Sequence, residues 1–104
     1  MTREAAFAAL AEPRRREILL LVRDQPLSVN EIAGQFDISQ QAVSQHLHVL
    51  RDAGLVAVRP VGQRRVYEIR PEGLTAVADF LSELWPSSLI RLKSEVESRR
   101  RRDS

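Results

Sequence analysis

A stretch in the middle of the chain joins an apolar helix stripe to a face of uncharged polar side chains. Residues 39–56 read SQQAVSQHLHVLRDAGLV, and polar residues recur at positions i, i+3, i+4 and i+7 of one helix face: Gln41, Ser44, Gln45 and His48. A helix face that meets only water usually carries charged side chains, and this face has no carboxylate. Glutamine amides can pair with adenine edges, and serine can hydrogen-bond to a base or to a phosphate. The pattern therefore favours contact with DNA over simple hydration.

Neither catalytic nor metal chemistry is indicated by the sequence. The chain has no cysteine, which excludes disulfides, thiolate nucleophiles and cysteine ligands for a metal. His46 and His48 are two residues apart and point to different sides of a helix, so they do not form a metal site together. His46 is expected to be half-buried beside Val43 and Leu47. The glycines are scattered singly and build no loop that could cradle a nucleotide. We expect no enzyme, no cofactor and no metal site.

The composition limits the class of protein. The chain has 104 residues, 43% of them hydrophobic and 29% charged, which suits one globular domain. No apolar run approaches the roughly 18 residues of a membrane span, and the N-terminus lacks the pattern of a secretory signal, so a cytoplasmic protein with no membrane partner is expected. The net charge is only +2, but arginine supplies every cationic residue except Lys93. The arginines cluster within residues 14–16, 59–70 and 99–102, where they could bind phosphate or simply keep the surface hydrated.

N-cap signals mark two helices in the middle of the chain. Ser28 and Glu31 have the spacing of a capping box, in which each side chain hydrogen-bonds to the backbone N–H of the other residue. Ser39 is the expected N-cap of the following helix. About three residues around Asp37 would separate the two helices, and an aspartate tolerates the left-handed conformation that such a turn could need. This arrangement predicts a helix-turn-helix.

The remaining elements follow from periodicity and from the positions of proline and glycine. Residues 3–11 are expected to form a short helix, and Pro13 suits the first turn of a second helix. The runs LVAVRP and RRVYEI alternate like strands and are joined by a glycine turn of Val61, Gly62 and Gln63. Pro71 opens the last helix. The order α-α-α-α-β-β-α predicts a winged helix-turn-helix, a mainly α fold with a small β-hairpin.

The first and last helices carry more apolar surface than one small domain needs. The residues concerned are Phe7, Leu10, Val77, Phe80, Leu81, Leu84 and Trp85. Part of this surface is expected to pair two copies of the chain, which predicts a homodimer through the first and last helices. Pro86 should kink or end the last helix, because a mid-helix proline removes a hydrogen bond, and a further helix is expected from about Ser87 to Ser98. The folded domain is expected to span residues 1–98, and residues 99–104 to form a basic, disordered tail.

The residues expected to bind DNA lie on the fourth helix and on the hairpin. On the helix they are Ser39, Gln40, Gln41, Ser44, Gln45, His48 and Arg51. Arg64 and Arg65 follow the hairpin turn, where they would reach phosphates or a minor groove as wing residues, or serve only as surface residues of a strand. In this arrangement the helix would enter the major groove and the hairpin would act as a wing.

The chain resembles the ArsR/SmtB family of winged-helix repressors. The resemblance rests on the segments FAALAEPRRREILLLV, LSVNEIAGQFDISQQAVSQHLHVLRDAGLV and VGQRRVYEIRPEGL, and it covers roughly residues 5–85. It implies a bacterial or archaeal homodimer that represses transcription from a pseudo-palindromic DNA operator, with the helix and wing residues named above facing the DNA. Metal-sensing members carry cysteines in the first helix of the helix-turn-helix or histidine and carboxylate clusters on the last helix. Val29–Phe36 has no thiol and the last helix has no histidine, so the chain resembles members that do not sense metals.

Two other functions fit the same sequence. A winged helix can serve as a protein-interaction module, which here would use the apolar strip around Phe80 and Trp85. A small-ligand sensor would instead hold its effector in a pocket at the dimer interface and release DNA in response. No polar cluster in the sequence points to the identity of such a ligand.

Overall fold

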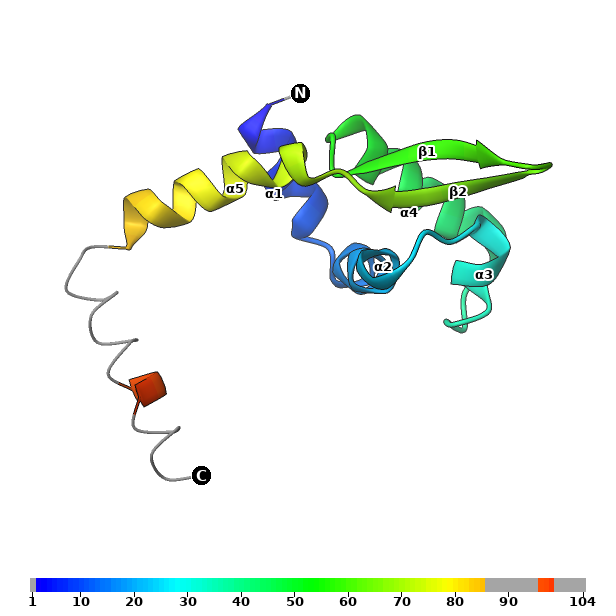
Figure 1. Ribbon diagram of the computed structural model, residues 1–104, viewed down its shortest axis with the longest axis horizontal. Coiled ribbons are helices and arrows are strands. Elements are labelled where there is room, and N and C mark those ends of the chain that lie inside the picture. Colours follow the sequence, from blue (N-terminus) through cyan, green and yellow to red (C-terminus); the bar gives the residue numbers. More distant parts are fainter. Residues whose placement is uncertain (1, 86–95, 99–104) are drawn as a thin grey trace.

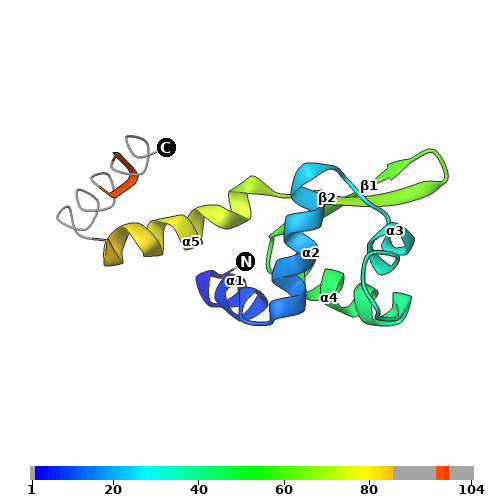
Figure 2. The same ribbon diagram turned by 90° about the horizontal axis from the view of Figure 1, so that it is seen from below.

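The computed structural model describes residues 2–85 and 96–98 and has the predicted order of elements. These are α1 (Arg3–Leu10), α2 (Pro13–Asp24), α3 (Val29–Ala33), α4 (Gln40–Asp52), β1 (Val56–Val61), β2 (Arg64–Ile69) and α5 (Pro71–Leu84). The hairpin of β1 and β2 leaves the helices on one side, and α5 leaves them on the opposite side (Figures 1 and 2). The prediction of a mainly α winged helix-turn-helix is confirmed. The helix expected after Pro86 and the basic tail fall mostly or wholly outside the described residues.

Side-chain caps begin four of the helices. The Ala42 N–H donates to Ser39 Oγ (3.0 Å) at the start of α4, which confirms the predicted cap. At α3 the capping box is complete, because the Ser28 N–H donates to Glu31 Oε1 (2.9 Å) and the Glu31 N–H donates to Ser28 Oγ (3.3 Å). Thr2 and Glu12 cap α1 and α2 in the same way, which the sequence reasoning missed. Each cap satisfies a backbone N–H that has no partner within its helix.

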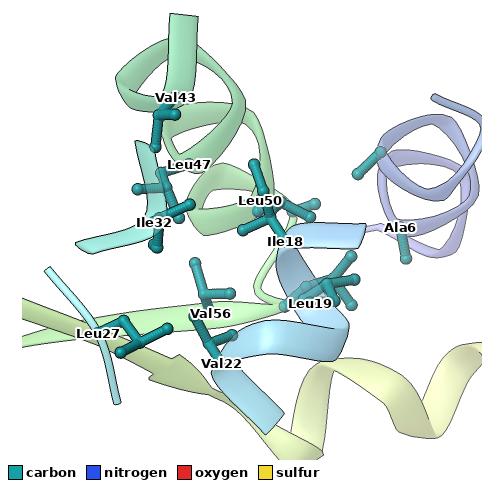
Figure 3. Packing of buried hydrophobic residues seen from close by; sticks show 13 residues of the cluster. Ala6, Ile18, Leu19, Val22, Leu27, Ile32, Val43, Leu47, Leu50 and Val56 are labelled. Carbon is teal, nitrogen blue, oxygen red and sulfur yellow. The ribbon is translucent and has the colours of Figure 1, made fainter. Parts of the chain in front are cut away.

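The core forms where α2, α3, α4 and β1 meet. Figure 3 shows Ile18, Ile32, Leu47, Leu50 and Val56 converging from these elements, and all of them are buried. α1 joins the core through small residues, since Ala6 and Ala9 are its buried positions. These contacts remove the apolar stripe of each helix from water, which is the main stabilising contribution in a domain of this size.

A single turn connects the end of α4 to both the hairpin and α5. Gly54 has a φ of 77°, a left-handed conformation that glycine adopts without steric cost. Its N–H donates to the Arg51 carbonyl, and the Leu55 N–H donates to the Leu50 carbonyl, both at 2.9 Å, which is the Schellman pattern. The Leu55 carbonyl then accepts from the Arg70 N–H (2.9 Å) just before α5. The direction of α4 is therefore coupled to that of the wing and of α5.

The hairpin is held in register at both ends. The strands pair from Val56 with Ile69 to Val61 with Arg64, so Gly62 and Gln63 alone form the turn. The prediction that Val61 belongs to the turn is wrong, because Val61 pairs as the last residue of β1. Gly62 has a φ of 62°, as the first central residue of a type II′ turn requires. At mid-strand, Leu27 and Tyr67 exchange two backbone hydrogen bonds (3.1 and 2.8 Å), which join the hairpin to the segment before α3.

The turn between α3 and α4 is longer than predicted. α3 ends at Ala33, so residues 34–39 separate it from α4 instead of about three residues around Asp37. The chain leaves the helix through tighter i to i+3 hydrogen bonds, from the Gln35 N–H to the Ile32 carbonyl and from the Phe36 N–H to the Ala33 carbonyl. Asp37 does not adopt a left-handed conformation, since among the described residues only glycines have a positive φ. The extra length removes the need for a strained residue.

The arginine cluster at the start of α2 binds the C-terminal end of α1. Arg15 donates to the Ala9 carbonyl (2.7 Å) and the Ala8 carbonyl (3.2 Å), and Arg16 donates to the Leu10 carbonyl (2.7 Å). The Ala8 carbonyl also accepts from the N–H of Ala11, the C-cap residue (3.3 Å), and all three carbonyls lie at the negative end of the α1 dipole. Cations in the first turn of α2 are unfavourable to the dipole of that helix, and the hydrogen bonds to the end of α1 offset this cost.

The contact between α5 and the turn after α4 predicts a strict requirement at Gly73. A Cβ at this position would lie 1.9 Å from the Gly54 carbonyl oxygen and 2.6 Å from its carbon. Gly73→Ala should therefore destabilise the fold by about 1–3 kcal/mol, because two backbone segments would have to separate. The measurement is urea unfolding at a fixed protein concentration.

Gly34→Ala is the matched control, since its Cβ would lie 3.4 Å from the Asn30 carbonyl oxygen and its φ is −67°. That substitution should change stability by less than about 1 kcal/mol. Equal unfolding midpoints for the two variants would contradict the close contact.

Candidate nucleic-acid interface

One face of α4 is fixed in the core and the other is open to solvent. Val43, Leu47 and Leu50 are completely buried. The predicted polar residues are all exposed on the same helix: Gln40, Gln41, Ser44, Gln45, His48 and Arg51. Burial of the apolar stripe therefore orients the amide and hydroxyl groups outward, as a helix that enters a DNA groove requires.

The N-terminal end of α4 is suited to an anion. Its first turn carries no acidic residue, so no carboxylate offsets the positive end of the helix dipole. The exposed Ser39 uses its hydroxyl oxygen to accept from the Ala42 N–H (3.0 Å), which leaves the hydroxyl hydrogen available for donation. A phosphate oxygen placed here would meet favourable charge and a hydroxyl donor.

The expectation of a face without carboxylates is wrong at its C-terminal end. Asp52 Oδ2 lies 3.1 Å from His48 Nε2, one helical turn further along. The sequence reasoning stopped the stripe at i+7, although Asp52 continues it at i+11. Both side chains are mostly exposed, so this contact orients His48 more than it stabilises the helix.

His46 lies on a different side of α4 and is half-buried, as predicted. It is close enough to Glu12, the N-cap of α2, to affect that carboxyl group. Burial alone would raise the pKa of Glu12, but hydrogen bonds from the Arg15 and Arg14 backbone and the nearby charges of His46 and Arg15 lower it overall. His46 therefore lies on the side of α4 that faces the start of α2, away from the exposed polar stripe.

The two arginines after the hairpin turn have different surroundings. Arg64, opposite Val61, forms an ion pair with Glu31 of α3. Arg65 forms no ion pair with any residue in the described part of the chain. Both arginines line an open groove of about 450 Å³ between the hairpin and the start of α3, together with Ser28 and Asn30. Both predicted wing arginines line this groove, and among the described residues Arg64 has a carboxylate partner whereas Arg65 has none.

The sequence reasoning identified Glu31 only as a capping residue. Hydrogen bonds from the Ser28 backbone N–H and hydroxyl, together with the nearby charge of Arg64, hold the pKa of this carboxyl below its ordinary value. Glu31 is therefore ionised at neutral pH. No local pattern could have revealed the pair, because its members are far apart in the sequence.

The residues predicted to form the dimer interface fall into three groups. Leu10 and Val77 pack against the core of their own chain. Phe7 and Phe80 contact each other edge to face, with ring centroids 4.9 Å apart, and so join α1 to α5. The third group is exposed: Leu81 and Leu84 lie on α5, and Trp85 is the residue that follows it.

A charged side chain borders this aromatic contact. The Arg3 guanidinium lies 4.9 Å from the centroid of the Phe80 ring and forms an ion pair with Glu83 (2.9 Å). These contacts hold the second half of α5 against α1, while Leu81 and Leu84 in the same part of the helix are exposed.

Residues 2–85 and 96–98 offer neither a cluster of metal ligands nor a membrane-spanning helix. No three His, Cys, Asp or Glu side chains come together there in a way that could hold a metal ion. None of the helices in that part of the chain has the length and apolar character needed to span a bilayer.

Comparison with known proteins agrees with this arrangement. Residues 12–58 match the family model "Bacterial regulatory protein, arsR family". The chain is 41% identical over 95 residues to the HTH-type transcriptional regulator Rv2034 of Mycobacterium tuberculosis, an alignment that covers 91% of this chain and 89% of that protein. It is 38% identical over 77 residues to the transcriptional activator HlyU of Vibrio cholerae, which covers 74% and 71%.

A solved structure extends the likeness to three dimensions. The homodimeric winged helix-turn-helix DNA-binding domain of Mb0332 from Mycobacterium bovis superposes with a TM-score of 0.65 at 28% identity, over 78% of this chain and 75% of that one. The buried stripe of α4, its exposed polar face, the paired hairpin and these relatives lead to one conclusion. The chain belongs to the ArsR family of bacterial regulatory proteins and is a winged helix-turn-helix, DNA-binding transcriptional regulator.

Proposed function

We propose that the chain is a cytoplasmic homodimeric repressor that binds a pseudo-palindromic operator. Residues 39–51 enter the major groove, and the hairpin serves as the wing. The observation that carries the proposal is the division of α4 into a completely buried apolar stripe and an exposed face of amides and hydroxyls. Side chains of this kind can read base edges, whereas lysines alone would bind any sequence.

The homodimer is proposed from the apolar end of α5. Leu81 and Leu84 are exposed on the last turns of this helix and lie outside the core cluster of the described residues. A second copy would cover them, and Mb0332, with the same fold, is a homodimer. Two copies would place two α4 helices in successive major grooves roughly 34 Å apart, which explains the need for a two-fold symmetric operator.

In this geometry the dimer would repress transcription by occupying its site on the DNA. A dimer that covers about one helical turn of DNA on both sides of a symmetry axis excludes other proteins from the same site. The regulator HlyU is named an activator, so related chains act in either direction. The described residues offer no metal cluster, and we propose that DNA binding does not depend on zinc.

Gln40→Ala tests base reading by α4. The substitution removes an exposed amide at the first helical position, so it should weaken operator binding by about 1–3 kcal/mol and relax the preference at one base pair. The measurement is a titration of the preferred DNA fragment and of its single-base variants, followed by fluorescence anisotropy.

Gln25→Ala is the matched control, because Gln25 is an equally exposed amide at the end of α2, outside the proposed interface. It should leave both affinity and preference as in the wild type. If Gln40→Ala behaves like this control, the assignment of Gln40 to base contact is wrong.

Leu84→Glu tests the dimer interface. Leu84 is 59% exposed, and a charge there would be buried in the proposed dimer without a partner, so the variant should sediment as a monomer at micromolar concentration. Leu20→Glu is the control, since Leu20 on α2 is 56% exposed and lies away from α5; it should sediment as a dimer like the wild type. A monomeric wild type would contradict the homodimer, and a dimeric Leu84→Glu variant would contradict this interface.

A further inference from the structure

The Glu31 carboxylate is held at a fixed point between the helix-turn-helix and the wing. Its Oε1 atom accepts from the Ser28 N–H (2.9 Å), while the Glu31 N–H donates to Ser28 Oγ. The same Oε1 atom accepts from the Arg64 guanidinium. The capping box therefore holds this carboxylate where it meets the first residue of β2.

This ion pair changes the charge that the wing presents. Arg64 and Arg65 both line the groove between the hairpin and α3, but the charge of Arg64 is balanced by Glu31. The side chains of Arg64 and Glu31 are 55% and 44% exposed, so water and ions reach the pair and it can open. A phosphate would compete with the carboxylate for the same guanidinium, since both anions accept its planar pairs of N–H groups.

We propose that Glu31 restrains Arg64, so that this arginine contacts the DNA backbone only where a well-placed phosphate displaces the carboxylate. The proposal rests on the proposed function, in which the hairpin is the wing. On non-operator DNA the pair stays closed, and the wing contributes the charge of Arg65 alone. Glu31 thus lowers affinity for DNA in general and increases the preference for the operator, which makes it a specificity-determining residue.

The lowered pKa of Glu31 agrees with this role, because the carboxylate keeps its charge throughout the neutral range. Asp52 gives no comparable restraint to the wing, since it lies on α4 and pairs with His48. Arg59 is also paired, with Glu68 of the neighbouring strand (3.1 Å), but neither residue lines the groove.

Glu31→Gln separates the charge of this residue from its capping role. Glutamine at this position of a capping box can still accept from the Ser28 N–H, so the start of α3 should be preserved. The probe is a random-sequence duplex of roughly 30 base pairs, titrated by fluorescence anisotropy at several salt concentrations. Release of Arg64 should tighten binding roughly 3- to 10-fold at 50 mM salt and steepen the slope of log K against log salt by about 0.9.

Two further variants make the outcome specific. Glu17→Gln removes the same charge from the Arg14 ion pair on α2, away from the groove, and should leave the slope unchanged. The double variant Glu31→Gln, Arg64→Ala removes the whole ion pair without changing the net charge, so it should bind the random duplex with the wild-type slope. A shallower slope for the double variant would mean that Arg64 already contacts phosphate in the wild type, and it would overturn the proposal.

The experiment also distinguishes failure of this inference from failure of the proposed function. Arg65→Ala should weaken binding to every duplex and flatten the slope by about 0.9 if the hairpin is the wing. If Arg65→Ala has this effect and Glu31→Gln behaves like Glu17→Gln or binds more weakly, only the restraint by Glu31 is wrong. If Arg65→Ala has no effect, the placement of the wing against DNA is wrong, and the proposal fails with it.

Discussion

The structure depends on the burial of one face of α4. Val43, Leu47 and Leu50 have no exposed surface, and they pack among side chains from α2, α3 and β1 (Figure 3). A helix held along its whole length by such contacts cannot rotate about its axis without exposing apolar surface or opening cavities. The outward direction of its amides and hydroxyls is therefore a consequence of the core. The turn at Gly54 connects α4 to the hairpin and to α5, so the orientation of α4 also determines the positions of these elements.

Most of the described arginines are used inside the chain. Arg15 and Arg16 cap the end of α1, Arg59 pairs with Glu68 on the hairpin, and Arg64 pairs with Glu31. A small net charge and partnered arginines suit a protein that must distinguish one DNA site from many others. An excess of unpaired cations would raise affinity for every sequence through counterion release.

The sequence predicted those parts of the structure that depend on neighbours along the chain. The capping box at Ser28, the cap at Ser39, the first-turn prolines of α2 and α5 and the glycine turn of the hairpin are all local signals, and each lies where it was expected. The exposed stripe of α4 followed from helical periodicity in the same way. Periodicity fixes the face of a helix but not the length of the turn before it, and the turn between α3 and α4 was predicted too short.

Contacts between distant residues could not be predicted in this way. The ion pair of Glu31 with Arg64 and the capping of α1 by Arg15 depend on how whole elements pack. The sequence alone offers several possible partners for each of these charges and does not tell which of them lies close in the fold. The sequence also does not reveal which apolar residues of α1 and α5 pack against the core. Periodicity does not tell whether Leu10 or Leu84 contacts its own chain or a second copy. The candidate DNA-binding surface is easiest to predict where a single helix builds it and hardest where two elements share it.

The measurement that tests the central claim most directly is binding of the purified protein to DNA fragments from the region upstream of its own gene. Shuffled fragments of equal length serve as the comparison, at two salt concentrations near and above physiological, first without metal and then with zinc. The account predicts that one upstream fragment is preferred, that the preference survives the higher salt and that zinc does not release the protein. Equal binding to all fragments that disappears with salt would contradict sequence reading by α4.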